Sequence, residues 1–354
     1  MERRPLGGEG HRRAEADRRR DAPGRALKPS SDPLSRKGFE VELLAPRGAS
    51  RSDLAAELAG RFAGRVVRRF HVDTEGSATP GVRTFWHLTP AFDVLDAAGD
   101  LRCSLVDDTT IVADLDAAAP ARPGWYRIVS DEPRLLRLVQ RYADPAEGIG
   151  SVLAPTAGLF GTAVREVGGV HRLDDGAGAT IAMAAPLPGE RERPCEVVTP
   201  PFADDHARRL EELLGPARDL GFTVPAEAAV HVNLDAGPFR DVAAFRHVVR
   251  TFARRREELR DLFGTNPRCR RLAPLPAELL DVVERDWPDW AALREAAAGT
   301  PVTKFSDVNL TRVLGVRPGP DVLEVRVLPG SIDGAGIARQ ADQLSEVLRG
   351  ARPA

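Results

Sequence analysis

Ligand-type side chains recur at every second position in short apolar segments of this sequence. Glu40 and Glu42 alternate with valine and leucine, and His231 and Asn233 do the same later in the chain. Because successive side chains of a β-strand point to opposite faces of the sheet, each pair projects from a single face. Carboxylate, imidazole and amide groups are ligands for hard or borderline divalent metals. The pattern therefore indicates a polar, metal-binding face on a sheet.

Two further segments carry charged side chains of the same kind. Glu196 interrupts an otherwise apolar run, and Glu324 and Arg326 flank a valine near the C-terminus. A single alternating strand with a solvated face is ordinary antiparallel architecture, so each segment taken alone fits that simpler interpretation. An exposed face usually carries mixed Lys, Thr, Ser and Gln, whereas these segments offer mainly carboxylates. Carboxylates that converge without a cation would repel one another, so their convergence implies bound metal.

The elements that must position these residues can be predicted from the periodicity of apolar residues. A period of two indicates strands, and a period of 3.6 with a capping residue indicates helices. No repeat and no clear linker divides the pattern, which predicts one α+β domain with antiparallel sheet. The expected strands are 39–44, 82–88, 92–95, 111–115, 195–198, 229–235 and 322–328, and the expected helices are 50–62, 204–214, 239–263 and 332–348.

The N-terminal segment, residues 1–37, is basic and poor in bulky apolar residues. It contains eleven Lys/Arg and six Asp/Glu, about +5 in charge, so the remaining chain carries about −7 of the total of −2. Such a segment cannot bury enough apolar surface to offset the entropy of ordering, so we expect a disordered Arg-rich tail and a catalytic domain over 38–350. A negatively charged domain argues against a specific nucleic-acid partner.

Membrane and export signals are missing from the sequence. No run of 18 apolar residues occurs and no signal-peptide pattern opens the chain, so we expect no membrane partner and a cytoplasmic location. Cys103, Cys195 and Cys269 lie far apart and in no CxxC spacing, which argues against a disulfide framework and a structural zinc site. None of the lysines lies in a GxxxxGK[ST] motif, so any ATP is held without a P-loop.

In this order, the charged segments resemble the motifs of the amidoligase family, a branch of the glutamine synthetase-like carboxylate–amine ligases. The matching segments are Glu40-Val-Glu42, Cys195-Glu-Val-Val-Thr-Pro-Pro201, His231-Val-Asn-Leu-Asp235, and Asn309 followed by Leu323-Glu-Val-Arg-Val-Leu-Pro-Gly330. The resemblance covers about residues 38–345, and the motifs gain specificity from their order. It implies a glutamine synthetase-like catalytic domain with a mainly antiparallel, curved sheet and flanking helices.

The resemblance also implies roles for individual residues. The expected ligands of Mg²⁺, or of Mn²⁺, are Glu40, Glu42, Glu196, His231 and Glu324. Arg326 would act with Glu324 in catalysis and contact the ATP phosphates or the acyl-phosphate. Asn309 and Asn233 would assist in binding the cofactor, although family members often carry a second histidine where this chain has Asn233.

Two further residues are expected near the substrates. Lys304 precedes the Asn309 segment and is either a second phosphate contact or a structural, ion-paired lysine. Asp108 lies in an acidic stretch that looks like one of the family, and it would face the substrate.

The implied activity is ATP-dependent joining of a carboxylate to an amine through an acyl-phosphate, with small molecules or peptides as substrates. Two alternatives remain open at this stage: a non-catalytic member that binds nucleotide, metal or peptide, and a metal-dependent amide hydrolase. Related synthetases form rings, so a homo-oligomer is among the assemblies that the resemblance allows.

Overall fold

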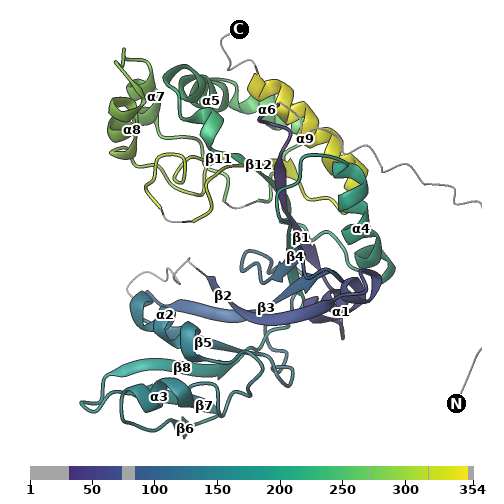
Figure 1. The fold of residues 1–354 in the computed structure, drawn as a ribbon, viewed down its shortest axis with the longest axis vertical. Helices are drawn as coiled ribbons and strands as arrows, with labels where there is room; N and C mark the ends of the chain where they lie inside the picture. The colour runs from purple at the N-terminus through teal and green to yellow at the C-terminus, as the bar shows by residue number, and fades with distance from the viewer. Residues whose placement is uncertain (1–31, 74–83, 270, 318, 350–354) are drawn as a thin grey trace, which may run out of the picture.

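The computed structural model of the protein describes residues 32–73, 84–269, 271–317 and 319–349. These residues form an α+β fold on an open, 12-stranded antiparallel sheet (Figure 1). The strand order is β11-β12-β10-β1-β9-β4-β3-β5-β8-β7-β6, and β2 pairs with β3. The strands are β1 (Lys37–Leu44), β2 (Arg65–Asp73), β3 (Trp86–Leu95), β4 (Leu101–Val106), β5 (Tyr126–Ser130), β6 (Arg165–Val167), β7 (Val170–Asp174), β8 (Thr180–Pro186), β9 (Pro194–Val198), β10 (Ala229–Asp235), β11 (Val308–Asn309) and β12 (Val322–Pro329).

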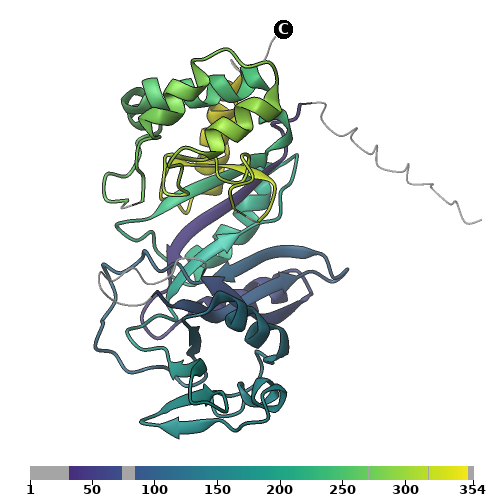
Figure 2. The same ribbon diagram turned by 90° about the vertical axis from the view of Figure 1, so that its left-hand side faces the viewer.

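Helices lie along the outside of this sheet. In Figure 1, α4 and α9 run along one side of β1 and β12, whereas α2 and α3 lie beneath β3 and β5. Figure 2 shows the helices of residues 240–300 at one end of the molecule and the strands of residues 165–186 at the other. The helices are α1 (Arg51–Arg61), α2 (Pro133–Tyr142), α3 (Ala154–Leu159), α4 (His206–Asp219), α5 (Val242–Arg254), α6 (Arg256–Phe263), α7 (Ala277–Val283), α8 (Trp290–Ala298) and α9 (Gly334–Arg349).

The upper half of the sheet has one apolar and one polar face. Phe39, Val41 and Leu43 of β1 are completely buried, and they belong to a cluster that includes residues of α1, α4, α5 and α9. Burial of each such side chain contributes about 1.5–3 kcal/mol. Glu40 and Glu42 alternate with them and therefore project from the other face.

The lower half repeats this arrangement with a second cluster. Leu88 of β3 and Ile128 of β5 pack with Leu136 and Val139 of α2. The helices thus cover the outer side of both halves, and the sheet bends between them (Figure 1). The polar face consequently lies on the inner side of the bend.

Several predicted elements are confirmed with small shifts. The strands at 39–44, 195–198, 229–235 and 322–328 correspond to β1, β9, β10 and β12, and the helix at 50–62 corresponds to α1. The backbone N–H of Ser50 donates to Oδ2 of Asp53 at 2.7 Å, which explains where α1 begins. The helices at 204–214 and 332–348 correspond to α4 and α9.

The predicted strand at 111–115 is wrong. Oε1 of Glu227 accepts hydrogen bonds from the backbone N–H groups of Val112 and Ala113, at 2.7 and 2.8 Å. These donors are therefore satisfied by a side chain and not by a neighbouring strand, and the segment forms turns.

The predicted helix at 239–263 is divided in the structure. Asp241 caps α5 by accepting hydrogen bonds from Ala243 N and Ala244 N, so α5 begins after it. Arg255, with φ −108° and ψ 24°, separates α5 from α6.

The predicted strands at 82–88 and 92–95 correspond to one strand, β3, which begins only at Trp86. Residues 84 and 85 precede it, and residues 82 and 83 lie outside the described part of the chain. Pro90 lies where β3 changes its neighbour from β5 to β4. Its carbonyl accepts a hydrogen bond from Arg51 Nε at 3.2 Å, so a side chain satisfies this acceptor where the neighbouring strand changes.

Most of the expected tail, residues 1–31, lies outside the described residues. Residues 32–37 are described: Leu34 is buried in the main cluster, and Lys37 begins β1 and contacts Asp342 at 3.0 Å. Among all residues that the structure describes, no helix has the length and apolar character required to cross a bilayer.

Candidate active site

Strand register brings the predicted ligand residues together. In the β1–β10 pair Glu40 is opposite His231, and in the β1–β9 pair Glu42 is opposite Glu196. Residues opposite each other in an antiparallel pair project from the same face. Strand β12, the other neighbour of β10, adds Glu324. Four carboxylates and one imidazole therefore meet on this face.

His231 lies at the centre of this group and is 4% exposed. Its Nδ1 lies 2.9 Å from Oε2 of Glu40, 3.6 Å from Oε1 of Glu324 and 4.0 Å from Oε1 of Glu196. Its Nε2 lies 3.4 Å from Oε1 of Glu42. Every proposed carboxylate ligand is thus within 4.0 Å of one imidazole ring.

The pKa values divide these carboxylates into two kinds. Burial raises the pKa of Glu40, but the hydrogen bonds from His231 and Asn233 and the charge of Arg326 outweigh it and lower the pKa to about 2. Burial, followed by the charge of Asp108, raises the pKa of Glu42 to about 8. Burial and the neighbouring charges of Glu40, Asp108 and Glu42 raise the pKa of Glu196 well above its usual value. Without a cation, ionising all of these carboxylates costs free energy, because they are buried and their negative charges repel one another.

The neighbouring carboxylates also shift the pKa values of His231 and Arg326. Burial and Arg326 oppose protonation of His231, but Glu40 and Glu42 prevail and raise its pKa. The pKa of Arg326 is likewise raised, because Glu324, Glu40 and Glu42 outweigh its burial.

Strands β11 and β12 supply the other side of the site. Asn309 and Asn233 both lie opposite Glu324, one on each neighbouring strand. Asn309 Nδ2 donates to Oε2 of Glu324 at 2.7 Å, and Arg326 Nη1 donates to its Oε1 at 2.7 Å. Asn233 Nδ2 donates to Oε1 of Glu40 at 2.8 Å. The two asparagines thus orient carboxylates of the site.

Three buried polar atoms at this site have no hydrogen-bond partner among the described residues: His231 Nε2, Asn233 Oδ1 and Arg326 Nε. Buried polar groups are nearly always satisfied, so unsatisfied ones at one place indicate a ligand. Two sets of ligand atoms are close enough to share an ion, Glu40 with His231 and Glu324, and Glu42 with Glu196 and His231. The donor types fit Mg²⁺ or Mn²⁺.

The sequence analysis missed the groups that hold the loop after β4, which carries Asp108. Arg191 donates to Oδ1 of Asp107 at 2.5 Å and to the carbonyl of Asp108 at 2.7 Å. Arg51, which is completely buried, lies 3.9 Å from Asp107 and 4.6 Å from the Trp125 ring centre. The charge of Asp108 acts on Glu42 and Glu196, so this loop borders the site.

Lys304 lies in the loop before β11. It is half-buried, and its Nζ lies 5.4 Å from the centre of the Phe305 ring. Its expected contact with phosphate stays a prediction.

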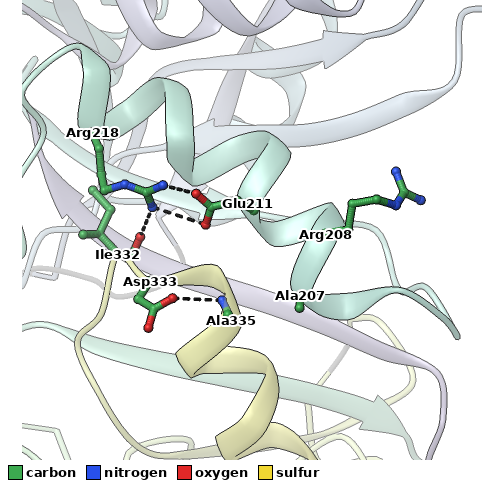
Figure 3. A pocket seen from close by; sticks show the side chains of 7 residues that line it. All are labelled: Ala207, Arg208, Glu211, Arg218, Ile332, Asp333 and Ala335. Atoms are coloured by element: carbon green, nitrogen blue, oxygen red, sulfur yellow. Dashed lines mark hydrogen bonds and ion pairs between the residues drawn. The ribbon is translucent and has the colours of Figure 1, made fainter.

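An open pocket lies elsewhere, on the outer side of the sheet between α4 and α9 (Figure 3). Arg218 and Glu211 form an ion pair across α4, and Arg218 also donates to the carbonyl of Ile332 at 2.7 Å. The other charged side chains that line the pocket are paired too, Arg208 with Asp205 and Glu212, and Asp333 with Arg339. We place the active site on the inner, polar face.

Comparison with known proteins identifies a family for this chain. A family model described as "Putative amidoligase enzyme" matches residues 33–342, which include every residue of the site. No curated protein and no solved structure gives a significant match. The family match spans most of the chain, and the chain belongs to the amidoligase family.

Proposed function

We propose that this protein is an ATP-dependent carboxylate–amine ligase that forms an amide or peptide bond through an acyl-phosphate. The observation that carries the proposal is the convergence of four carboxylates around His231 on one sheet face. Membership of the amidoligase family supports a ligase. The substrates would be small-molecule or peptide carboxylates and amines.

The metal ligands would be Glu40, Glu42, Glu196, His231 and Glu324. The unpartnered Nε2 of His231 and the raised pKa values of Glu42 and Glu196 support this assignment, because a divalent cation would supply the missing partner and the missing positive charge. When bound, Mg²⁺ or Mn²⁺ would neutralise charge on the β- and γ-phosphates of ATP.

Arg326 is suited to hold phosphate oxygens. Its guanidinium is mostly buried, with 12% of the side chain exposed, and Nη1 bonds Glu324 while Nε has no partner among the described residues. A planar guanidinium binds phosphate oxygens through two parallel hydrogen bonds. Lys304 would add a second phosphate contact, and Asn233 and Asn309 would keep Glu40 and Glu324 in position.

The reaction needs two displacements. A carboxylate oxygen of the substrate attacks the γ-phosphorus of ATP, the bond from that phosphorus to the β–γ bridging oxygen breaks, and ADP leaves. The amine nitrogen then attacks the acyl carbon, the bond to the phosphate oxygen breaks, and inorganic phosphate leaves as the amine loses a proton. Asp108 would accept that proton; Arg191 holds its loop, and the charge of Asp108 acts on Glu42 and Glu196.

The test is phosphate release from Mg-ATP by the purified protein across a panel of carboxylates, acidic peptides, amino acids and ammonia. We expect release that requires both a carboxylate and an amine, with an amide as product. Glu324→Gln should reduce the rate at least about 100-fold, because it removes a ligand and a partner of Arg326. Glu346→Gln, a change at an exposed position of α9, should leave the rate unchanged.

Two other outcomes would overturn the ligase assignment. Amide cleavage without ATP would indicate a metal-dependent hydrolase. Nucleotide binding without turnover for any pair of substrates would indicate a non-catalytic binding protein.

A further inference from the structure

The polar face of the sheet continues beyond the metal-ligand candidates. Glu40 is opposite Val198 in β9, Val198 is opposite Ser104 in β4, and Ser104 is opposite Asp93 in β3. These four positions share one face, since partners across an antiparallel pair project together. The odd-numbered positions of β3 therefore lie on the same face as the candidate active site.

A group of basic and polar side chains occupies this continuation. Thr89 and His87 follow Asp93 on the same face of β3, and His71 of β2 lies opposite Thr89. His87 lies opposite Val129 of β5, so Arg127, two residues before Val129, shares the face. We call these residues, with Arg69 of β2, the basic patch.

Polar atoms of the basic patch lack partners among the described residues. Thr89 is 4% exposed and its Oγ1 accepts or donates no hydrogen bond, and the buried Nδ1 of His87 has no partner either. The guanidinium of Arg127 is exposed, and no hydrogen bond or ion pair with a described residue is present for it. Unsatisfied polar atoms at neighbouring positions on one face of the sheet indicate a ligand that forms hydrogen bonds.

The neighbouring carboxylates are already engaged by other arginines. Asp93 accepts from Arg69 Nε at 2.7 Å. Asp107 accepts from Arg191 at 2.5 Å and lies 3.9 Å from Arg51. Arg127 thus has no direct ion pair with a described carboxylate, and it lies on the same face as the strongly acidic metal-ligand group.

The charges of these groups also act on one another. Partial burial and the positive charge of Arg191 lower the pKa of Arg127, whereas Asp107 raises it. Burial and the charge of Arg127 lower the pKa of His87, and burial and the charge of Arg69 lower the pKa of His71 to about 4. Neutral imidazoles donate one hydrogen bond each without adding charge.

We propose that the basic patch binds a second carboxylate of the acyl-donor substrate, with Arg127 as its main ion-pair partner, so that the protein prefers dicarboxylate-type substrates. This inference deepens the proposed function and rests on it. The guanidinium of Arg127 offers the paired donors that match a carboxylate, and Thr89 and His87 add neutral donors beside it. A nucleotide phosphate could also accept hydrogen bonds from Arg127. Arg326, beside the metal-ligand candidates, is already assigned to the phosphates of ATP, which favours a substrate carboxylate as the ligand of the basic patch.

The experiment measures equilibrium binding by calorimetry, with Mg²⁺ present and ATP omitted so that no turnover occurs. The probes are succinate, glutarate and adipate, each compared with its monoamide, which keeps one carboxylate and the same chain length. ADP is a separate probe. The variants are Arg127→Gln and Arg127→Lys, with Arg134→Gln as the control, because Arg134 is an exposed arginine of α2, on the other side of the sheet.

We expect wild-type protein to bind at least one dicarboxylate about tenfold or more tightly than its monoamide. Arg127→Gln should abolish that difference, Arg127→Lys should keep part of it, and Arg134→Gln should keep all of it. ADP binding should be the same in all four proteins. The proposal is overturned if wild-type protein shows no preference for any dicarboxylate, or if Arg127→Gln weakens ADP binding as much as dicarboxylate binding.

This test is separable from that of the proposed function. If the protein prefers a dicarboxylate but shows no turnover, the result would contradict the proposed ligase function but not the proposed role of the basic patch. Ligase turnover without any dicarboxylate preference would contradict the patch alone.

Discussion

Glu42 lies directly opposite Glu196 in the β1–β9 pair. A hydrogen bond from the backbone N–H of Ala229 to Oε2 of Glu42, at 2.8 Å, holds the carboxyl of Glu42 in position. Like charges opposite each other in antiparallel strands destabilise the pair. The fold therefore holds two acidic groups together at a cost that a bound cation would remove.

Glu196→Gln is expected to stabilise the metal-free protein. Removal of one of two facing carboxylates should raise the free energy of unfolding by about 0.5–1 kcal/mol, measured by urea denaturation in the presence of a chelator. Addition of Mg²⁺ should stabilise wild-type protein more than this variant, because the variant lacks one ligand. A variant that is less stable than wild type without metal would show that the two carboxylates do not repel each other.

Asn233→Ala is expected to weaken metal binding with little effect on folding. Asn233 Nδ2 orients Glu40, and loss of such an orienting bond lowers metal affinity by about 10–100-fold. The measurement is Mn²⁺ binding followed by electron paramagnetic resonance.

The control for that change is Gln340→Ala. Gln340 Nε2 donates to the carbonyl of Phe263, outside the site, so this variant should lose stability but retain its affinity for Mn²⁺. Equal Mn²⁺ affinities of wild type and Asn233→Ala would contradict the assignment of Glu40 as a ligand held by Asn233.

His71 should make the protein less stable in mild acid. Burial, followed by the charge of Arg69, lowers its pKa from 6.5 to about 4. Below pH 6.5 the unfolded chain takes up a proton at this ring while the folded protein does not, so stability is complete above pH 6.5 and falls toward pH 4. At pH 5 the loss is about 2 kcal/mol. His71→Gln should reduce the difference in unfolding free energy between pH 7.5 and pH 5 by about that amount. An unchanged difference would mean that His71 is protonated in the folded state.

The ligand residues could be predicted from the sequence because polar and apolar side chains alternate along each of these strands. Val41 separates Glu40 from Glu42 and is completely buried, so the apolar position fixes which face the carboxylates occupy. The class of the fold and the strands that carry the site follow from the same pattern.

Strand order and register could not be predicted from that pattern. Glu40 and His231 are opposite each other although 191 residues separate them, and only tertiary packing sets this pairing. Strands β2, β4, β5, β6, β7, β8 and β11 were not predicted. Strand β6, for example, has three residues and all of them are exposed, so it carries no apolar alternation. The basic patch has no local motif, since Arg127 and Thr89 come together only through the neighbours of β3.

Arg256 is expected to stabilise β11 and, through it, the site. Asp307 has 2% of its side chain exposed and accepts hydrogen bonds from Arg256 Nε at 2.6 Å and Arg260 Nη1 at 3.2 Å. Its carbonyl accepts from the backbone N–H of Arg326 at 2.9 Å, so Asp307 fixes the strand that carries Arg326. Arg256→Ala leaves a buried carboxylate with one partner and should cost about 3 kcal/mol of unfolding free energy.

The adjacent Arg255 provides the matched control. It pairs with Glu258 on an exposed helix face, so Arg255→Ala should cost at most about 1 kcal/mol. Adding Asp307→Asn to Arg256→Ala should recover part of the lost stability, because no ionised carboxylate then remains buried at this position. Equal destabilisation by Arg255→Ala and Arg256→Ala in urea denaturation would contradict a buried ion pair at Asp307. If the pair holds β11 as argued, Arg256→Ala should also lower the rate of phosphate release at temperatures where the variant is still folded, because the backbone contact to Arg326 loosens with Asp307.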